Sequence, residues 1–171
     1  KALVCVFMFG GNDSHNMLVP QEQAAYSTYR TLRRSLALPD NSAKLLPITT
    51  KAGAHFALND GLTPIAPLWD SGKLAAIANV GMLAAPTTRQ QYLDTSVPLP
   101  TNLFSHSDQV IQKQAGDANG SGGTGWAGRI ADGVNSLNGT AKFPAAFSMS
   151  GPALFGTGSV IQSASLYPGF D

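Results

Sequence analysis

Four polar side chains that could carry out chemistry follow the most apolar stretch of the chain. Residues 2–9 form an unbroken apolar run, and Gly10 and Gly11 stop it. An amide, a carboxylate, a hydroxyl and an imidazole come next, at Asn12, Asp13, Ser14 and His15. The glycines permit positive φ angles, which would let Asp13 turn back toward an ion or a phosphate. An alternative stays open, in which this is a polar turn and Asp13 caps the next element.

A second set of candidate groups lies where a helix is predicted to begin. Either Ser105 or Ser107 occupies the N-cap position of a helix that ends at Gly116. A hydroxyl there lies beside free backbone N–H groups and the positive end of the helix dipole, so it suits an oxygen of a phosphate or sulfate. Capping alone also explains these residues.

A serine nucleophile at this position would need activation. The chain has no convincing order of Ser, His and Asp with the spacing of a catalytic triad. A metal ion held by Asp13 and other ligands could lower the pKa of the hydroxyl instead. The residues therefore favour a metal-assisted reaction over a triad.

Two apolar segments are expected to position these groups as central strands. Residues 2–9 and 73–81 have the composition of strands that are buried on both faces of a sheet. The pattern between them predicts one helix over residues 20–38 and another over residues 60–72. This order predicts an α/β fold with a largely parallel sheet flanked by helices. Asp13 and the later hydroxyl should then converge over one edge of that sheet.

The remaining pattern predicts shorter elements. Residues 45–48 contain a proline and suit an edge strand, and residues 89–93 form a weak helical patch. Further strands are expected at residues 145–149 and 159–161. The sequence from Gly120 to Gly125 fits the G-x-G-x-x-G pattern, but it follows no strand, so it predicts a loop and not a dinucleotide site.

A helix is predicted from Trp126 to Leu137. Its spacing places four apolar side chains on the inner face, those of Trp126, Ile130, Val134 and Leu137. Arg129 and Asp132 are expected on the outer face. Arg129 could bind an anion, but a solvated or ion-paired arginine is the commoner explanation and is favoured here.

Composition excludes several classes of protein. The 171 residues are enough for one domain with a real core, and the net charge of +1 with 12% charged residues gives no surface for nucleic acid or an anionic membrane. The single cysteine, Cys5, is expected to be buried in the first strand, which excludes a disulfide framework. No apolar run approaches the roughly 18 residues of a membrane span. The chain also starts close to its first strand, so we expect that a leader has been removed.

Four blocks of the sequence resemble successive blocks of the bacterial domain of unknown function 1501 family. They are residues 1–14, 72–81, 103–109 and 125–129. That family is similar in fold to the alkaline phosphatase and sulfatase superfamily, and its precursors often carry a twin-arginine leader. The resemblance implies a periplasmic or secreted protein. It also implies that residues 1–171 are the N-terminal part of a single, incomplete alkaline-phosphatase-like domain.

The resemblance also implies site residues. Asp13 matches the metal-binding aspartate after the first strand, and residues 105–107 match the region of the hydroxyl nucleophile. Ser105 is the first candidate for that hydroxyl, Ser107 the second, and His106 is a candidate metal ligand. The implied cofactor is a divalent ion, either zinc, manganese or calcium. The chain departs from the family at Asn59, where many relatives have histidine, and it lacks the later Asp-x-His and Asp-His blocks of the metal site.

These observations lead to three functional hypotheses. The first is a metal-dependent hydrolase of a small anionic phosphate or sulfate ester, which works together with the missing C-terminal half of the same protein. The second is a non-catalytic secreted binding or surface-assembly protein on a hydrolase-like scaffold, because low charge and long polar loops suit an extracellular surface. The third, a nucleotide-binding module, is disfavoured because no phosphate loop follows a strand.

Overall fold

The computed structural model describes residues 2–167 and divides the chain into two compact units, Lys1–Ala78 (unit 1) and Asn79–Asp171 (unit 2). The helices and strands of unit 1 are, in chain order, β1 (Leu18–Pro20), α1 (Gln23–Arg33), β2 (Leu45–Thr49), β3 (His55–Asn59) and α2 (Pro67–Asp70). Three short 3-10 helices accompany them: η1 (Ser14–Asn16), η2 (Arg34–Leu36) and η3 (Asp60–Leu62).

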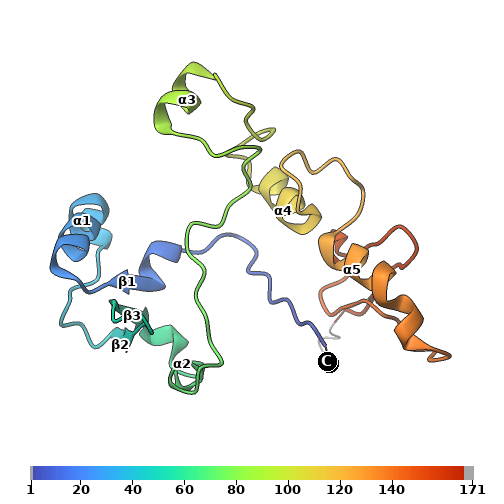
Figure 1. Ribbon diagram of the computed structural model, residues 1–171, viewed down its shortest axis with the longest axis horizontal. Coiled ribbons are helices and arrows are strands. Elements are labelled where there is room, and N and C mark those ends of the chain that lie inside the picture. Colours follow the sequence, from blue (N-terminus) through green and yellow to red (C-terminus); the bar gives the residue numbers. More distant parts are fainter. Residues whose placement is uncertain (1, 168–171) are drawn as a thin grey trace. The chain divides into compact units, whose positions relative to one another are not determined.

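The core of unit 1 lies between α1 and a small sheet (Figure 1). The sheet is antiparallel in the order β1-β3-β2, with Val19 opposite Ala57. Both side chains are fully buried. The buried rings of Tyr26 and Tyr29 in α1 join them, and the Tyr26 hydroxyl donates a hydrogen bond of 2.8 Å to the carbonyl of Leu38. Apolar packing with satisfied hydroxyl groups therefore holds this unit together.

The predicted α/β fold with a largely parallel sheet is wrong. Strands make up only 10% of the chain, in one three-stranded antiparallel sheet and one two-stranded parallel sheet. Residues 2–9 and 73–81, predicted as central strands, form no strand. Apart from Phe7 and Leu74, which are half-buried, their side chains are exposed, to 84% at Val6 and 83% at Ile77. A strand is stable only when its N–H and C=O groups have partners, and here neither segment has a neighbouring strand.

Among the other elements predicted for unit 1, the edge strand and the first helix form, and the second helix forms only in part. Pro47 lies in an edge strand, β2, as predicted, and α1 with η2 occupies most of residues 20–38. The helix predicted over residues 60–72 is broken into η3 and α2. Cys5 is exposed, so its predicted burial is wrong, for the same reason that its strand does not form.

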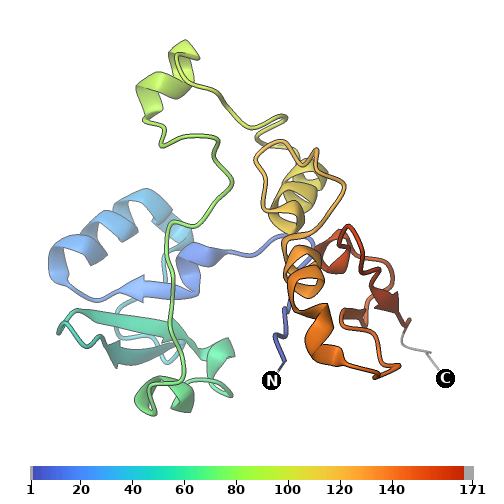
Figure 2. The same cartoon turned by 45° about the vertical axis from the view of Figure 1, so that its right-hand side comes forward.

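Unit 2 consists of short elements joined by long loops. They are α3 (Arg89–Asp94), α4 (His106–Ala115), α5 (Trp126–Val134), the 3-10 helix η4 (Asn135–Asn138), β4 (Phe147–Ser148), the 3-10 helix η5 (Leu154–Gly156) and β5 (Ala164–Ser165). Helix α3 lies apart from α4 and α5 in both views (Figures 1 and 2). The helices predicted at residues 89–93 and 106–116 are confirmed, and the one predicted over residues 126–137 forms as α5 followed by η4. The strand predicted at residues 159–161 is wrong, because β4 pairs with β5 instead.

Helix α5 packs through small residues and not through the predicted apolar face. Ile130, Val134 and Leu137 are exposed, whereas Gly128 and Ala131 are buried. A Cβ atom added to Gly128 would overlap the carbonyl group of Thr157, so the helix approaches that backbone as closely as a glycine permits. The predicted inward position is therefore wrong for Ile130, Val134 and Leu137, because backbone contact decides the orientation. Trp126 is half-buried and packs edge-on against Phe155, with the ring centroids 4.6 Å apart, as its predicted inward position requires.

No helix within residues 2–167 has both the length and the apolar character that crossing a bilayer requires.

Candidate functional site

Helix α4 begins at Ser105 because this residue is a good N-cap. Its backbone is extended, and its hydroxyl accepts a hydrogen bond of 3.3 Å from the N–H of Asp108. Gly116, in the left-handed conformation with φ of 67°, ends the helix. The predicted bounds of this helix are therefore confirmed, and they place three candidate residues, Ser105, His106 and Ser107, at its start.

The Ser105 hydroxyl lies in a small polar cluster. It donates a short hydrogen bond to the carboxylate of Asp108, and the Ser107 hydroxyl is 3.1 Å from it. Ser105 is half-buried, whereas His106 and Ser107 are exposed. The cluster therefore fixes the direction of one hydroxyl and leaves the neighbouring side chains open to solvent.

Asp108 is the residue that the sequence prediction missed at this site. Hydrogen bonds from the side chains of Ser105 and then Asn102 lower its pKa, so its carboxyl group is ionised at neutral pH. The detectable signal was the Ser-x-x-Asp spacing, because an acidic residue three positions after an N-cap serine commonly returns to the helix start.

Backbone N–H groups give this site its electrostatic character. Those of His106 and Ser107 lie in the first turn of α4, where the helix itself offers no acceptor. Such groups attract an anionic oxygen, and the ionised Asp108 opposes it. The arrangement can therefore orient the Ser105 hydroxyl near two N–H donors, but it also places the negative charge of Asp108 close to any anion that binds there.

Asp13 lies in unit 1, just before η1, and forms an ion pair with Arg33. About half of its side chain is exposed, and it makes no capping hydrogen bond to η1. Asp13 thus occupies the N-cap position of η1, as the alternative from the sequence expected, but its side chain does not cap the helix. An arginine partner also competes with a cation for the same carboxylate oxygen.

The predicted metal ligands do not form a coordination shell in the part of the chain described. Among residues 2–167, no three His, Cys, Asp or Glu side chains are grouped closely enough to hold a metal ion. Asp13 belongs to unit 1 and His106 to unit 2. The residues present thus do not fit a metal site by themselves, and we derive no chemical step through a metal.

The convergence of Asp13 with Ser105 stays a prediction. The parallel sheet whose edge was expected to bring them together does not form. Asn59, the position where many members of the family have histidine, has a structural role: its side chain accepts from the N–H of Gly61 at 3.0 Å and donates to the carbonyl of Asn16 at 3.1 Å.

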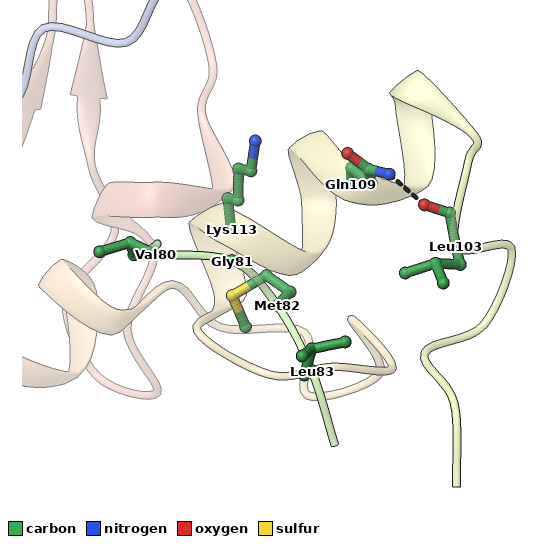
Figure 3. Close-up of a pocket in the computed structure, with 7 residues that line it drawn as sticks. All are labelled: Val80, Gly81, Met82, Leu83, Leu103, Gln109 and Lys113. Carbon is green, nitrogen blue, oxygen red and sulfur yellow. Dashed lines mark hydrogen bonds between the residues drawn. The ribbon is translucent and has the colours of Figure 1, made fainter. Parts of the chain in front are cut away.

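A pocket of about 250 Å³ lies along α4, within unit 2. Residues 80–83 and Leu103 line it together with Gln109 and Lys113 of the helix (Figure 3). The side-chain amide of Gln109 donates a hydrogen bond to the carbonyl of Leu103, which ties the segment before Ser105 to the helix. No sequence pattern had marked this pocket, because residues 80–83 were assigned to a strand and its end.

Membership of the domain of unknown function 1501 family, proposed from four sequence blocks, has no independent support. Comparisons of the chain with family models, with curated proteins and with solved structures found no match.

Proposed function

We propose that this chain belongs to a periplasmic or secreted hydrolase of phosphate or sulfate esters, with Ser105 as the reacting hydroxyl. One observation carries the proposal: hydrogen bonds with Asp108 orient the Ser105 hydroxyl at the N-terminus of a ten-residue helix, where the N–H groups of the first turn have no acceptor within the helix. Those groups would bind an oxygen of the anionic ester.

The reaction balances without an added oxidant or reductant. The Ser105 oxygen attacks phosphorus or sulfur, the bond to the alcohol oxygen breaks, and the alcohol leaves with the hydroxyl proton. Water then hydrolyses the ester on Ser105 and restores the hydroxyl. Asp108 holds the hydroxyl in position through their hydrogen bond. Its negative charge disfavours an anion, so the N–H groups of the first turn of α4 must outweigh this repulsion.

The experiment must separate a reacting hydroxyl from a helix cap. Ser105→Asn keeps a residue that caps well but removes the hydroxyl, whereas Ser105→Thr keeps both. We expect the full-length protein that contains this chain, and its Ser105→Thr variant, to cleave an aryl phosphate or aryl sulfate, and its Ser105→Asn variant to lose at least 100-fold in kcat/KM. Assays with zinc, manganese, calcium or a chelator test the predicted cofactor.

Thr88→Ala is the matched control. Thr88 caps α3 by the same kind of contact, accepting from the N–H of Gln91 at 3.2 Å, and it lies outside α4. Its loss should leave cleavage unchanged. Equal cleavage by Ser105→Asn and the wild-type chain would refute Ser105 as nucleophile and would move attention to Ser107, the second candidate.

The alternative, a non-catalytic binding or surface-assembly protein, has an observation of its own. Several large apolar side chains that were expected inside central strands are exposed, among them Val4, Val6, Ile77 and Val80. Exposed apolar surface of this extent is typical of proteins that associate. Sedimentation that shows assembly of an inactive wild-type chain would favour this function over hydrolysis.

A further inference from the structure

Helix α5, orange in Figure 1, and the 3-10 helix η4 that follows it present an apolar face to solvent. Ile130, Val134 and Leu137 share this face through their spacing of four and then three residues, and they are 51%, 45% and 85% exposed. The other side of α5, with Gly128 and Ala131, is the side that packs within unit 2. Apolar side chains gain free energy when they leave water, so this face is suited to a partner.

Both charged residues of α5 are engaged inside unit 2 and do not interrupt this face. The guanidinium group of Arg129 donates to the carbonyls of Ala115 and Thr124. The carboxylate of Asp132 accepts from the N–H groups of residues 159–161. In a two-fold interface the same patch is used twice, so a charge near its centre would lie close to its own equivalent and repel it. An uncharged face avoids this repulsion and is compatible with a second copy of itself.

Gly133 forms a notch in this face. It lies three residues after Ile130 and four before Leu137, and a Cβ atom added there would find nothing within 4 Å in the part of the chain described. Two α5 helices that run antiparallel about a two-fold axis between positions 133 and 134 place Val134 of each copy against Gly133 of the other. The same axis places Ile130 of each copy against Leu137 of the other. A large side chain thus faces the notch of each copy, which is the fit that helix packing requires.

Two phenylalanine side chains extend the apolar surface beyond the end of η4. Phe143 and Phe147 are 70% and 41% exposed, and their ring centroids are 6.1 Å apart. The carbonyl of Phe143 accepts a hydrogen bond of 2.9 Å from the side-chain amide of Asn138, which holds this segment beside η4. Burial of these two side chains and the three of the helix face in both copies would remove on the order of 1,000 Å² from water, the lower limit for a specific interface.

We infer that this protein forms a two-fold symmetric dimer, in which the apolar face of α5 and η4 packs antiparallel against the same face of a second copy. The occupant is a second copy because the face is uncharged and because its notch fits its own side chains. An interface at the lower limit of size makes the dimer reversible. The inference is separate from the proposed reaction, because the interface belongs to α5, η4 and the loop after them, whereas Ser105 caps α4.

A change of charge at the two-fold axis tests this arrangement. Sedimentation equilibrium of the full-length protein that contains this chain should show a reversible dimer at high micromolar concentration. Val134→Glu brings two carboxylates together at the axis, so we expect it to raise the Kd of the dimer at least 100-fold. A mixture of Val134→Glu with Val134→Lys should form the dimer again, because the two charges are then opposite. Leu93→Glu, at a residue of α3 that is 55% exposed, is the matched control and should leave the Kd unchanged.

Disulfide formation tests the register of the two helices. Cys5→Ser first removes the single natural thiol. A mixture of Ile130→Cys with Leu137→Cys should then cross-link under mild oxidation, whereas each variant alone should not. Identical positions lie about 10 Å apart along the helix axis in this register, which is beyond the reach of a disulfide.

Three results would overturn the inference: a monomeric wild-type protein, a dimer that tolerates Val134→Glu as well as Leu93→Glu, or cross-links only between identical positions. Circular dichroism checks that each variant is folded, and Ile130→Glu replaces Val134→Glu if the latter fails to fold. The mass of the dimer and the cleavage of an ester are separate measurements. The dimer can therefore fail while cleavage through Ser105 holds, and the reverse.

Discussion

The cores of the two units are built from different kinds of contact. In unit 1, the fully buried residues Val19 and Ala57 pack against two tyrosine rings. In unit 2, the largest fully buried side chain is Gln112, 1% exposed, whose amide donates to the carbonyl of Thr101 at 2.7 Å. Removing atoms from an apolar core lowers the free energy of unfolding in proportion to the volume removed. Removing one donor or acceptor atom, in contrast, breaks a buried hydrogen bond completely.

Further polar contacts continue this pattern in unit 2. Arg129, considered from sequence as an anion-binding group, donates to the carbonyl of Ala115 at 2.7 Å and so joins α5 to the end of α4. Buried Gln114 accepts from the N–H of Phe155 at 3.1 Å. Asp132, predicted to face outward, accepts from the N–H groups of residues 159–161. We therefore expect added methyl groups and acid to lower the free energy of unfolding more in unit 2 than in unit 1.

The largest decrease in the free energy of unfolding is expected from Gly128→Ala in unit 2. The added methyl group would overlap the carbonyl group of Thr157, so α5 must move, at a cost of about 3 kcal/mol. Urea unfolding followed by the fluorescence of Trp126, in a chain with Trp69→Phe, measures this cost. Gly133→Ala in the same helix is the control, because nothing lies within 4 Å of the new atom. That change should stabilise the helix by about 0.5 kcal/mol, and equal losses in both variants would contradict the close packing.

The second-largest decrease in the free energy of unfolding is expected from Val19→Ala in unit 1. Removing two buried methyl groups should lower the free energy of unfolding by about 2 kcal/mol. Trp69, whose indole donates to the carbonyl of Thr49 at 3.1 Å, reports on this unit in a chain with Trp126→Phe. Val6→Ala, at an exposed site, should change the unfolding midpoint little. A similar loss in both valine variants would show that unit 1 lacks the apolar core described.

Acid should affect unit 2 through Asp132. Hydrogen bonds from the N–H groups of Ile161, Ser159 and Val160 lower the pKa of this carboxyl group below its unfolded value of about 3.9. Its stabilising contribution is thus fully present above pH 4 and is lost as the pH falls through the folded pKa. The midpoint of Trp126 unfolding, measured between pH 2 and pH 7, should fall more steeply in the wild-type chain than in Asp132→Asn. Parallel profiles would exclude this role.

The smallest effect is expected from Asp13→Asn. The ion pair with Arg33 is partly exposed, so its loss should cost less than about 1 kcal/mol. The same variant tests the metal prediction, because a bound ion stabilises the folded state. If Asp13 is a ligand, manganese or zinc should raise the unfolding midpoint of unit 1 in the wild-type chain and not in the variant. Equal responses would exclude Asp13 as a ligand.

The candidate site could be predicted from sequence only where the signals are local. The start of α4 at Ser105 and its end at Gly116 follow from short-range capping, since each cap contacts residues within four positions. The edge position of β2 followed from Pro47 in the same way. The pocket brings residues 80–83 to a helix that begins more than 20 positions later, and no local pattern encodes that contact.

By itself, the sequence determined the bounds of α4, because capping acts over one turn of the chain. The tertiary structure decided which apolar residues are buried and which segments become strands, because both depend on partners far along the chain. Residues 2–9 have every compositional mark of a strand and remain exposed without a neighbour. In α5, the close fit of Gly128 against the backbone of Thr157 turned Ile130 and Val134 toward solvent.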